Sequence, residues 1–261
     1  AAGLLLVVFL LYPYDSHKPQ MEATISHIAG PPMTVGGIST SLMPKPSITL
    51  SDVRSEGSGG VRISRIHLVP EILTLLGVRS AFVSVDLEGL SLESGVVAGL
   101  PRAMAVALSP AGGVSITTLR VSNSSLDLMG LKLGELQGEM RQPAAGVALP
   151  VLLSTPDRSL KLSLQERDGS LTGDVEAYAW RPHEQSRFRF DSIQARLLWN
   201  GARLEITSLD ARIFGGAILG TLVLDTQQGQ PGIAGNLEVK HMDLQRLIGG
   251  LGEGEKHQGE I

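Results

Sequence analysis

The chain has 261 residues, a formal net charge of −4, 43% hydrophobic residues and only 4% aromatic residues. An acidic chain without a basic, aromatic stripe argues against a general attraction to nucleic acid, and the absence of Cys excludes disulfides, iron–sulfur clusters and thiol catalysis. Absence of Cys also suits an oxidising compartment, and the length allows one large β domain or two small ones.

The chain opens with an uninterrupted apolar run, AAGLLLVVFLL, that ends at Tyr12-Pro13-Tyr14. About 14 helical residues reach only about 21 Å, against a hydrocarbon core of about 30 Å. We therefore interpret residues 1–14 as the end of a longer transmembrane anchor, with Tyr12 and Tyr14 in the aromatic belt. A signal-peptide core and a buried helix are the alternatives. The predicted anchor residues are Leu4, Leu5, Leu6, Val7, Val8, Phe9, Leu10 and Leu11.

The next stretch predicts two short helices with strands between them. Asp15 to Ile28 can form a helix because Asp15-Ser16 can cap it and Pro19 falls in its first turn. Pro70 near the start and Gly77 at the end predict a second helix over Val69 to Gly77. The strand candidates are Thr34 to Leu42, Ser47 to Arg54 and Val61 to Leu68.

From Phe82 the sequence predicts strand after strand. Val83, Val85 and Leu87 alternate with polar residues, and a change of phase after Gly89 predicts a bulge or turn. Spacings of roughly 10 to 15 residues leave no room for crossover helices, so we expect a mainly antiparallel sheet. Comparable runs are Ala103 to Leu108, Val114 to Leu128, Leu131 to Met140, Leu160 to Leu164, Leu171 to Tyr178 and Phe188 to Trp199.

The stretch from Leu204 to Leu251 predicts three more strands and one short amphipathic helix. Apolar residues alternate with polar ones at Leu204 and Ile206, and again at Leu237 and Val239. Turns at Gly215-Gly216 and at residues 228–232 separate the three runs.

The alternating apolar residues of these strands form a long apolar surface that must be shielded from water, and two arrangements of the sheet could shield it. One is a closed β-sandwich with a dry core, the commoner solution for strands at this spacing. The other is an incompletely closed sheet along which acyl chains lie. The low aromatic content favours the second, because small aliphatic side chains line a smooth channel but fill a thick core poorly.

Two segments resemble the AsmA-like family of bacterial envelope proteins. The first consists of MTVGGISTSLMPKPSITLSDVR, VRISRIHLVPEILTLLG and VSVDLEGLSL in that order, and the second of FGGAILGTLVLD and GNLEVKHMDLQRLIGGL. The resemblance implies a single-pass inner-membrane protein whose periplasmic β-sheet curls into a groove and assists lipid transport or outer-membrane biogenesis. YPYDSHKPQME is also similar to the opening of type II secretion protein N, which implies a structural part of an export machine instead.

No residue pattern indicates catalysis, a metal or a cofactor. Asp86 with Glu88, and Asp210 with Asp225, could act as acid and base, but carboxylates on alternating strands are normally the solvated face. Glycine-rich segments lack the features of a phosphate-binding loop. The histidines lack metal-ligand spacing and are expected at the surface: His17, His27, His67, His183, His241 and His257.

We therefore predict a mainly β protein, with an antiparallel, curled or groove-forming sheet, a few short helices and an N-terminal membrane helix. Residues 1–14 form the end of the anchor and residues 15–261 the periplasmic domain. Its expected partners are membrane lipids, without nucleic acid; in the alternative, sheet edges bind secretion-system proteins by strand addition. A third possible function, besides lipid transport and a structural role in secretion, is that of an envelope hydrolase. The candidate groove residues are Val83, Val85, Leu87, Leu160, Leu162, Leu164, Leu204 and Ile206.

Overall fold

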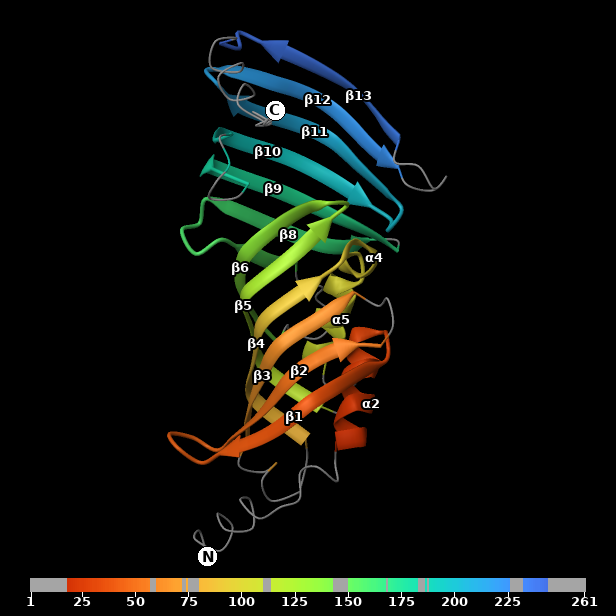
Figure 1. Ribbon diagram of the computed structural model, residues 1–261, viewed down its shortest axis with the longest axis vertical. Coiled ribbons are helices and arrows are strands. Elements are labelled where there is room, and N and C mark those ends of the chain that lie inside the picture. The colour runs from red at the N-terminus through yellow and green to blue at the C-terminus, as the bar shows by residue number, and fades with distance from the viewer. Residues whose placement is uncertain are drawn as a thin grey trace, which may run out of the picture.

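The computed structural model describes residues 18–56, 60–71, 74, 80–109, 114–142, 150–167, 169–182, 186, 188–225 and 232–243. Within these ranges thirteen strands form one long sheet, and their order in space is their order in the chain (Figure 1). The strands are β1 (Met33–Ser41), β2 (Ser47–Ser55), β3 (Val61–Pro70), β4 (Ser80–Leu92), β5 (Val114–Leu128), β6 (Leu131–Arg141), β7 (Val151–Ser154), β8 (Leu160–Arg167), β9 (Ser170–Trp180), β10 (Phe190–Trp199), β11 (Arg203–Ile213), β12 (Gly216–Asp225) and β13 (Gly232–Lys240).

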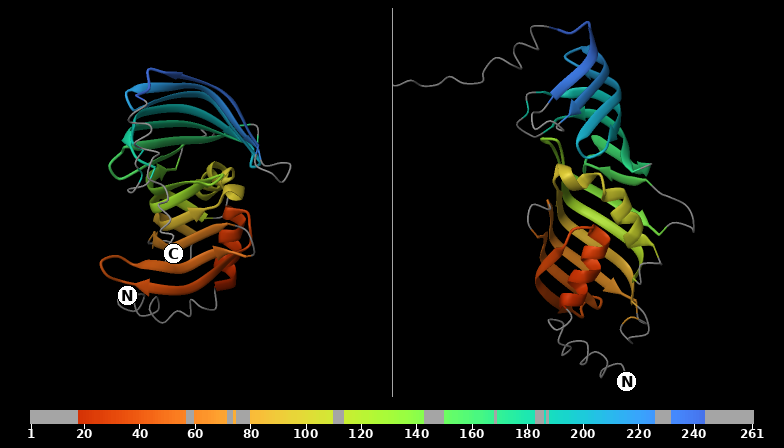
Figure 2. Two further views of the ribbon diagram at one scale, coloured as in Figure 1. Left: turned by 45° about the horizontal axis from the view of Figure 1, so that its top comes forward. Right: turned by 90° about the vertical axis from the view of Figure 1, so that its right-hand side faces the viewer.

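The sheet is open. β1 and β13 stand at opposite ends of the strand order, and within the described strands they do not pair with each other. The views in Figure 2 show the strands following one another along the molecule rather than forming two separate sheets. The mainly β prediction is confirmed, and the closed sandwich of two sheets is not formed by these strands.

Neighbouring strands pair antiparallel with one exception, the parallel pair of β4 and β5. A parallel pair needs a crossover connection. Here helices α4 (Ser94–Val97) and α5 (Leu100–Leu108) lie in that connection. The prediction that no crossover helix fits between strands is therefore wrong at this one place.

The strand predicted from Ala103 to Leu108 is also wrong, because these residues form most of α5. Leu100, Met104 and Ala107 recur at helical spacings of four and three and are buried on one side of the helix. The run starting at Ala103 is too short to separate this period from the alternation of a strand.

Helix α2 (Lys18–Ala29) confirms the described part of the helix predicted from Asp15 to Ile28. Met21, Ile25 and Ile28 are partly buried and pack against the core. α2 contacts β1 and α5, so the two longer helices cover the N-terminal strands on one face of the sheet (Figure 2).

The change of phase predicted after Gly89 is confirmed as an irregularity inside β4. Gly89 has a φ of 69°, and its Cα faces the side chain of Ser64 in the neighbouring strand. Mid-strand residues with positive φ recur in β2, β5 and β6 at Asp52, Asn123 and Glu135. Such residues bend and twist a sheet, since they interrupt the regular pleat.

The core lies along one apolar face and runs without a break from β1 to β11. Most of its members are aliphatic, as the composition predicts, but Trp199 is fully buried and Trp180 stacks on Phe190 at a ring-centroid distance of 6.0 Å. Phe82 of β4 also packs against the core, so the buried tryptophans, but not all of the aromatic rings, lie in the C-terminal strands.

The strand pairing is shortest between β6 and β7, where the described residues form one pair in register, Gln137 opposite Ser154. β7 has four residues, VLLS, and was not predicted because so short a run has no readable period. The core continues across this junction through Leu136 and Leu153, both buried.

The remaining strand predictions are confirmed with small shifts of their ends. Val69 and Pro70, predicted to begin a helix, belong to β3, and most of that predicted helix lies outside the described residues. The predicted anchor, Leu4 to Leu11, and the helix predicted after Asp243 also lie outside them. Among the described helices, none is both long enough and apolar enough to cross a membrane.

Candidate functional site

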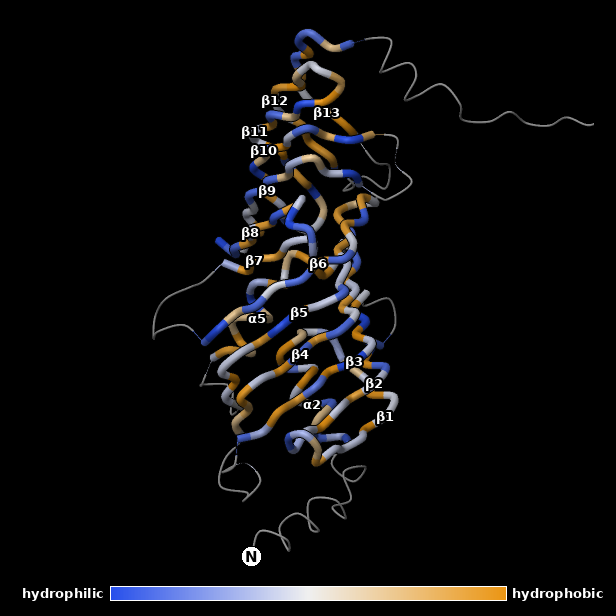
Figure 3. Tube along the Cα trace, turned by 90° about the vertical axis from the view of Figure 1, so that its left-hand side faces the viewer, coloured by the Kyte–Doolittle hydropathy of each residue, from blue (hydrophilic) through white to orange (hydrophobic). Residues whose placement is uncertain are grey.

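The strongest candidate site is the apolar face of the last four strands. Cross-strand register places the alternating apolar residues of β10 to β13 on the same face, which continues the core. Figure 3 shows hydrophobic and hydrophilic residues alternating along these strands. We call this surface the C-terminal apolar face; it comprises Ile193, Ala195, Leu197, Trp199, Leu204, Ile206, Leu209, Ala211, Ile218, Leu222, Leu224, Ile233, Leu237 and Val239.

Large and small residues alternate across the two last strands of this face. Leu222 of β12 lies opposite Gly235 of β13, and Leu237 of β13 lies opposite Gly220 of β12. A Cβ atom at Gly235 would come within 2.6 Å of the Thr221 carbonyl oxygen. The glycines therefore allow the two backbones to approach while each leucine lies beside a position without a side chain.

Exposure rises steadily along the C-terminal apolar face. Trp199 of β10 is 0% exposed and Leu204 of β11 only 5%. Leu222 of β12 is partly buried, and Ile233 and Val239 of β13 are 73% and 58% exposed. A contiguous apolar surface thus passes from closed core to open surface within a few strands.

The position of the helices explains this gradient. α5 contacts β5 and reaches β8, and α2 lies beside β1. In the described part of the chain no helix covers β10 to β13 (Figure 1). The N-terminal strands therefore bury their apolar residues against helices, whereas the last strands leave theirs partly open to solvent.

The opposite face of the same strands is largely polar and charged. Arg196 of β10 binds Asp174 of β9 at 3.0 Å, and Arg203 binds Glu205 within β11 at 2.7 Å. Large apolar side chains on this face, such as Tyr178 and Leu198, are scattered singly and need no special explanation. On the C-terminal apolar face, by contrast, the exposed residues Ile233, Leu237 and Val239 follow one another along β13.

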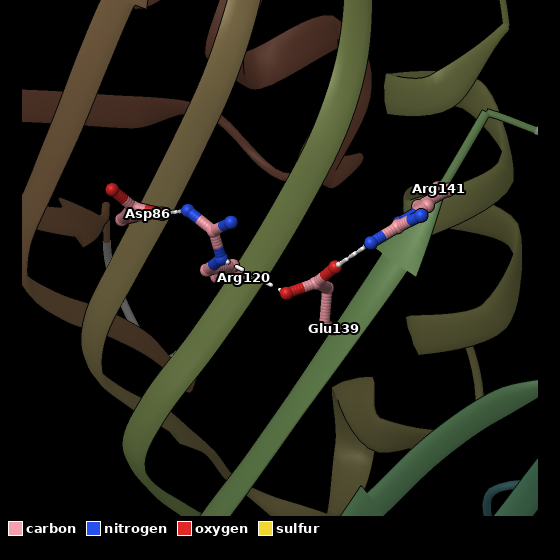
Figure 4. A network of polar contacts seen from close by, with 4 residues as sticks. All are labelled: Asp86, Arg120, Glu139 and Arg141. Atoms are coloured by element: carbon pink, nitrogen blue, oxygen red, sulfur yellow. Dashed lines mark hydrogen bonds and ion pairs between the residues drawn. The ribbon is translucent and has the colours of Figure 1, made fainter.

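A ladder of charges crosses the polar face of the N-terminal strands (Figure 4). Arg120 of β5 contacts Asp86 of β4 at 3.5 Å and Glu139 of β6 at 3.0 Å, and Glu139 also binds Arg141 at 3.1 Å. The hydrogen bond from Arg120, followed by that from Arg141, holds the pKa of Glu139 below its ordinary value. The hydrogen bond to Glu139 is the main reason that the pKa of Arg120 is raised.

This ladder accounts for the carboxylates considered as acid and base. Asp86 pairs with Arg120, and Glu88 with Arg65 at 2.7 Å, on an exposed surface. Asp210 lies opposite Leu219 whereas Asp225 lies opposite Arg203, so these two carboxylates sit at different ends of the β11–β12 pair. Neither pair forms a buried, convergent site.

The first three candidate groove residues have different environments in β4. Val85 is buried and Leu87 is partly buried, and both belong to the core on the apolar face. Val83 is 50% exposed because the alternation breaks between Phe82 and Val85, where the β3–β4 register shifts. The structure does not place Val83 beside the other two.

The remaining candidates lie in β8 and β11. Leu160, Leu162 and Leu164 are each 2% exposed, so they lie inside the closed core. Leu204 is buried, and Ile206 is partly buried within the C-terminal apolar face. Of the eight candidates, Leu204 and Ile206 belong to this face, and Ile206 is the more exposed of the two.

The prediction missed most of the open part of the face, in β12 and β13. Its signal is an apolar pattern that the two strands share: Ile218, Gly220, Leu222 and Leu224 in β12 match Ile233, Gly235, Leu237 and Val239 in β13. The sequence shows alternation at Leu237 and Val239, but alternation alone does not show which strands pack against a helix and which are exposed to solvent.

The described residues hold no group of three or more His, Asp or Glu that could bind a metal ion. His67 contacts Thr49 at 3.2 Å, and His17, His183 and His257 lie outside the described residues. A pocket of about 430 Å³ near Ser94, Asp127 and Lys132 lies at one end of β4 and β5. The Asp127 carboxylate there already accepts hydrogen bonds from Ser94 and from the Gly130 N–H, which is a structural arrangement.

Comparison of the chain with protein-family models, with curated proteins and with solved structures finds no match in any of the three.

Proposed function

We propose that the C-terminal apolar face holds acyl chains of membrane lipids. The observation that carries this proposal is the gradient of exposure from Trp199 in β10 to Ile233 in β13 along one continuous face. Such a face offers an acyl chain apolar contact along several strands without requiring a closed pocket. Lipid positioning of this kind needs no catalytic residue.

Covering the exposed side chains of the C-terminal apolar face with an apolar ligand is favourable in free energy. Full burial of a Leu, Ile or Val side chain is worth about 1.5–3 kcal/mol, so covering three side chains that are about half exposed contributes roughly 3 kcal/mol. Ile233, Leu237 and Val239 are 73%, 46% and 58% exposed. An acyl chain presents only methylene groups, which match this surface and leave no polar group unsatisfied.

The proposed setting is that implied by the AsmA-like resemblance. Residues 1–14 would be the end of an inner-membrane anchor, and the sheet would stand in the periplasm beside the lipid source. The protein would then assist lipid transport or envelope biogenesis by shielding acyl chains from water as they leave the bilayer.

The test places a photo-activatable phenylalanine analogue at single positions of the 261-residue chain expressed in a bacterial host. At Leu222, on the apolar face of β12, we expect illumination to attach phospholipid, detected by mass spectrometry of the intact protein. The matched control is the neighbouring Thr221, whose side chain is exposed on the opposite face.

A second matched pair lies in β13, at Ile233 on the apolar face and Ala234 on the other face; both residues are exposed, so substitution does not test folding. At least tenfold more lipid adduct at Leu222 and Ile233 than at the two controls would support the proposal. Equal adducts on both faces, or none, would overturn it.

A structural role in a secretion system is the second candidate. It is favoured by β13, which pairs with β12 on one side and, within the described residues, with no strand on the other. In the same experiment, adducts of Ile233 to a secretion-system protein rather than to lipid would support this role.

A further inference from the structure

The two edges of the sheet differ in whether side chains cap the backbone N–H groups of the edge strand. At the β1 edge, helix α2 supplies acceptors for backbone donors: Ser26 Oγ accepts from the Met33 N–H at 2.8 Å, and Glu22 Oε1 accepts from the Val35 N–H at 2.9 Å. Capping of this kind blocks pairing with another strand. The β1 edge is therefore closed over its first residues.

The β13 edge has no comparable cap. All nine residues of β13, from Gly232 to Lys240, are exposed, and in the described part of the chain the strand pairs only with β12. Its free backbone groups form a template for one more strand. Helix α2 blocks the first residues of the β1 edge, so a β1 strand of another molecule could not pair along its whole length.

We propose that the added strand is β13 of a second copy of this chain, paired antiparallel about a twofold axis at Asn236. In this register Leu237 lies opposite Gly235 of the second copy, and Ile233 lies opposite Val239. The first of these pairs repeats the match of leucine to glycine that joins β12 to β13, where Leu237 lies opposite Gly220 and Gly235 opposite Leu222.

The sequences explain why a second β13 fits this edge. β12 presents Ile218, Gly220, Leu222 and Leu224 to one side of β13, and β13 itself carries Ile, Gly, Leu and Val at the same spacing. The second copy therefore offers the outer side of β13 nearly the same surface that β12 offers the inner side.

The opposite face also tolerates this register. Glu238 lies opposite Ala234 of the second copy, and Lys240 lies opposite Gly232, so no two like charges are directly opposed. A twofold axis perpendicular to the sheet keeps both apolar faces on the same side. Pairing therefore doubles the C-terminal apolar face into one continuous surface.

Cysteine cross-linking tests this dimer because the natural chain contains no cysteine. We expect Asn236→Cys in the full chain, in membranes of the expression host, to form dimers under mild oxidation or with a short bismaleimide. Opposed residues of paired strands have Cβ atoms about 4.5–5.5 Å apart, which a short bismaleimide spans and a disulfide reaches at the lower end of the range.

The matched control is Thr221→Cys, exposed in β12 and opposite Asn236. Its two copies would be separated by three strand spacings, about 14 Å, and should form at least tenfold less dimer. The register is tested by mixing two tagged chains: Ala234→Cys in one and Glu238→Cys in the other should cross-link, whereas Ala234→Cys alone should not.

The proposal is overturned if Asn236→Cys dimerises no more than Thr221→Cys, or if its adducts are to other proteins. Equal yields from the Ala234→Cys mixture and from Ala234→Cys alone would also overturn it. These readouts do not depend on lipid binding, so the dimer and the proposed function can fail separately.

Discussion

Gly138 of β6 lies directly against the backbone carbonyl of Leu152 in β7, with no room for a Cβ atom between them. This contact lies where the strand pairing is shortest, since one pair of residues in register joins β6 to β7. Close approach of the two backbones thus compensates for the short ladder, and only glycine permits it.

We expect Gly138→Ala to lower the free energy of unfolding by about 1–3 kcal/mol, because the backbones must separate or the sheet must bend. Urea unfolding followed by circular dichroism measures the loss. Gly134→Ala is the control in the same strand, since a Cβ atom there meets nothing within 4 Å. This control should be neutral or slightly stabilising; an equal loss in both variants would mean that the Leu152 contact is unimportant.

Much of the sheet was predictable because most strands have one apolar and one polar face. The period of two is clear at Leu160, Leu162 and Leu164, which are all buried, and the irregularity at Gly89 shows as a change of that period. The α5 helix and the parallel β4–β5 pair were not predictable in this way. Their signal is the four-residue spacing from Leu100 to Met104, which begins three residues before the strand predicted from Ala103 to Leu108.

The site was less predictable than the fold. Leu162 and Ile233 have the same kind of apolar side chain on alternating strands, yet Leu162 is 2% exposed and Ile233 is 73% exposed. The difference comes from the helix crossing near β8 and from the position of β13 at the edge. Alternation identifies the apolar face, but tertiary packing decides which part of it is open.

The charge ladder predicts a dependence of stability on pH. The pKa of Glu139 is lowered in the folded state by its hydrogen bonds to Arg120 and Arg141, so its contribution is present at neutral pH. That contribution is lost as the pH falls below 4.5, the ordinary value, and through the lowered pKa. Glu139→Gln should therefore destabilise the protein slightly near neutral pH, and this effect should disappear once the pH lies well below the lowered pKa of Glu139.

Urea unfolding of both proteins across this range checks the prediction, and high salt should shrink the difference at neutral pH because the ladder is exposed. Glu135→Gln, an exposed carboxylate on the same strand, is the control. A Glu139→Gln effect that persists undiminished in acid would show that the ion pairs are not its cause.

Thr155 stabilises the turn between β7 and β8 through hydrogen bonds. Its buried hydroxyl accepts a hydrogen bond from the Leu160 N–H at 3.0 Å and donates one to Asp157 at 2.7 Å. We expect Thr155→Val to cost about 1–3 kcal/mol, because the buried Leu160 N–H loses its acceptor. Thr172→Val is the control; its hydroxyl contacts the Gln165 carbonyl at 3.2 Å in a partly buried strand position, and the loss should be smaller.

The same substitution should raise the pKa of Asp157 in the folded state. The Thr155 hydroxyl, followed by the Ser159 backbone N–H, holds that pKa below its ordinary value. NMR titration of the Asp157 carboxyl in both proteins measures the change. An unchanged pKa in Thr155→Val would show that the Ser159 N–H alone is sufficient.

Removal of the α2 caps should open the β1 edge. In a Glu22→Ala, Ser26→Ala double variant, the Met33 and Val35 N–H groups lose their side-chain acceptors. An edge strand with free donors pairs with other edges, so we expect assemblies larger than those of the natural chain in analytical ultracentrifugation. Thr24→Ala is the control in the same helix, because the Thr24 hydroxyl bonds only to the Gln20 carbonyl. If the double variant sediments like this control, α2 does not protect the edge through these two side chains.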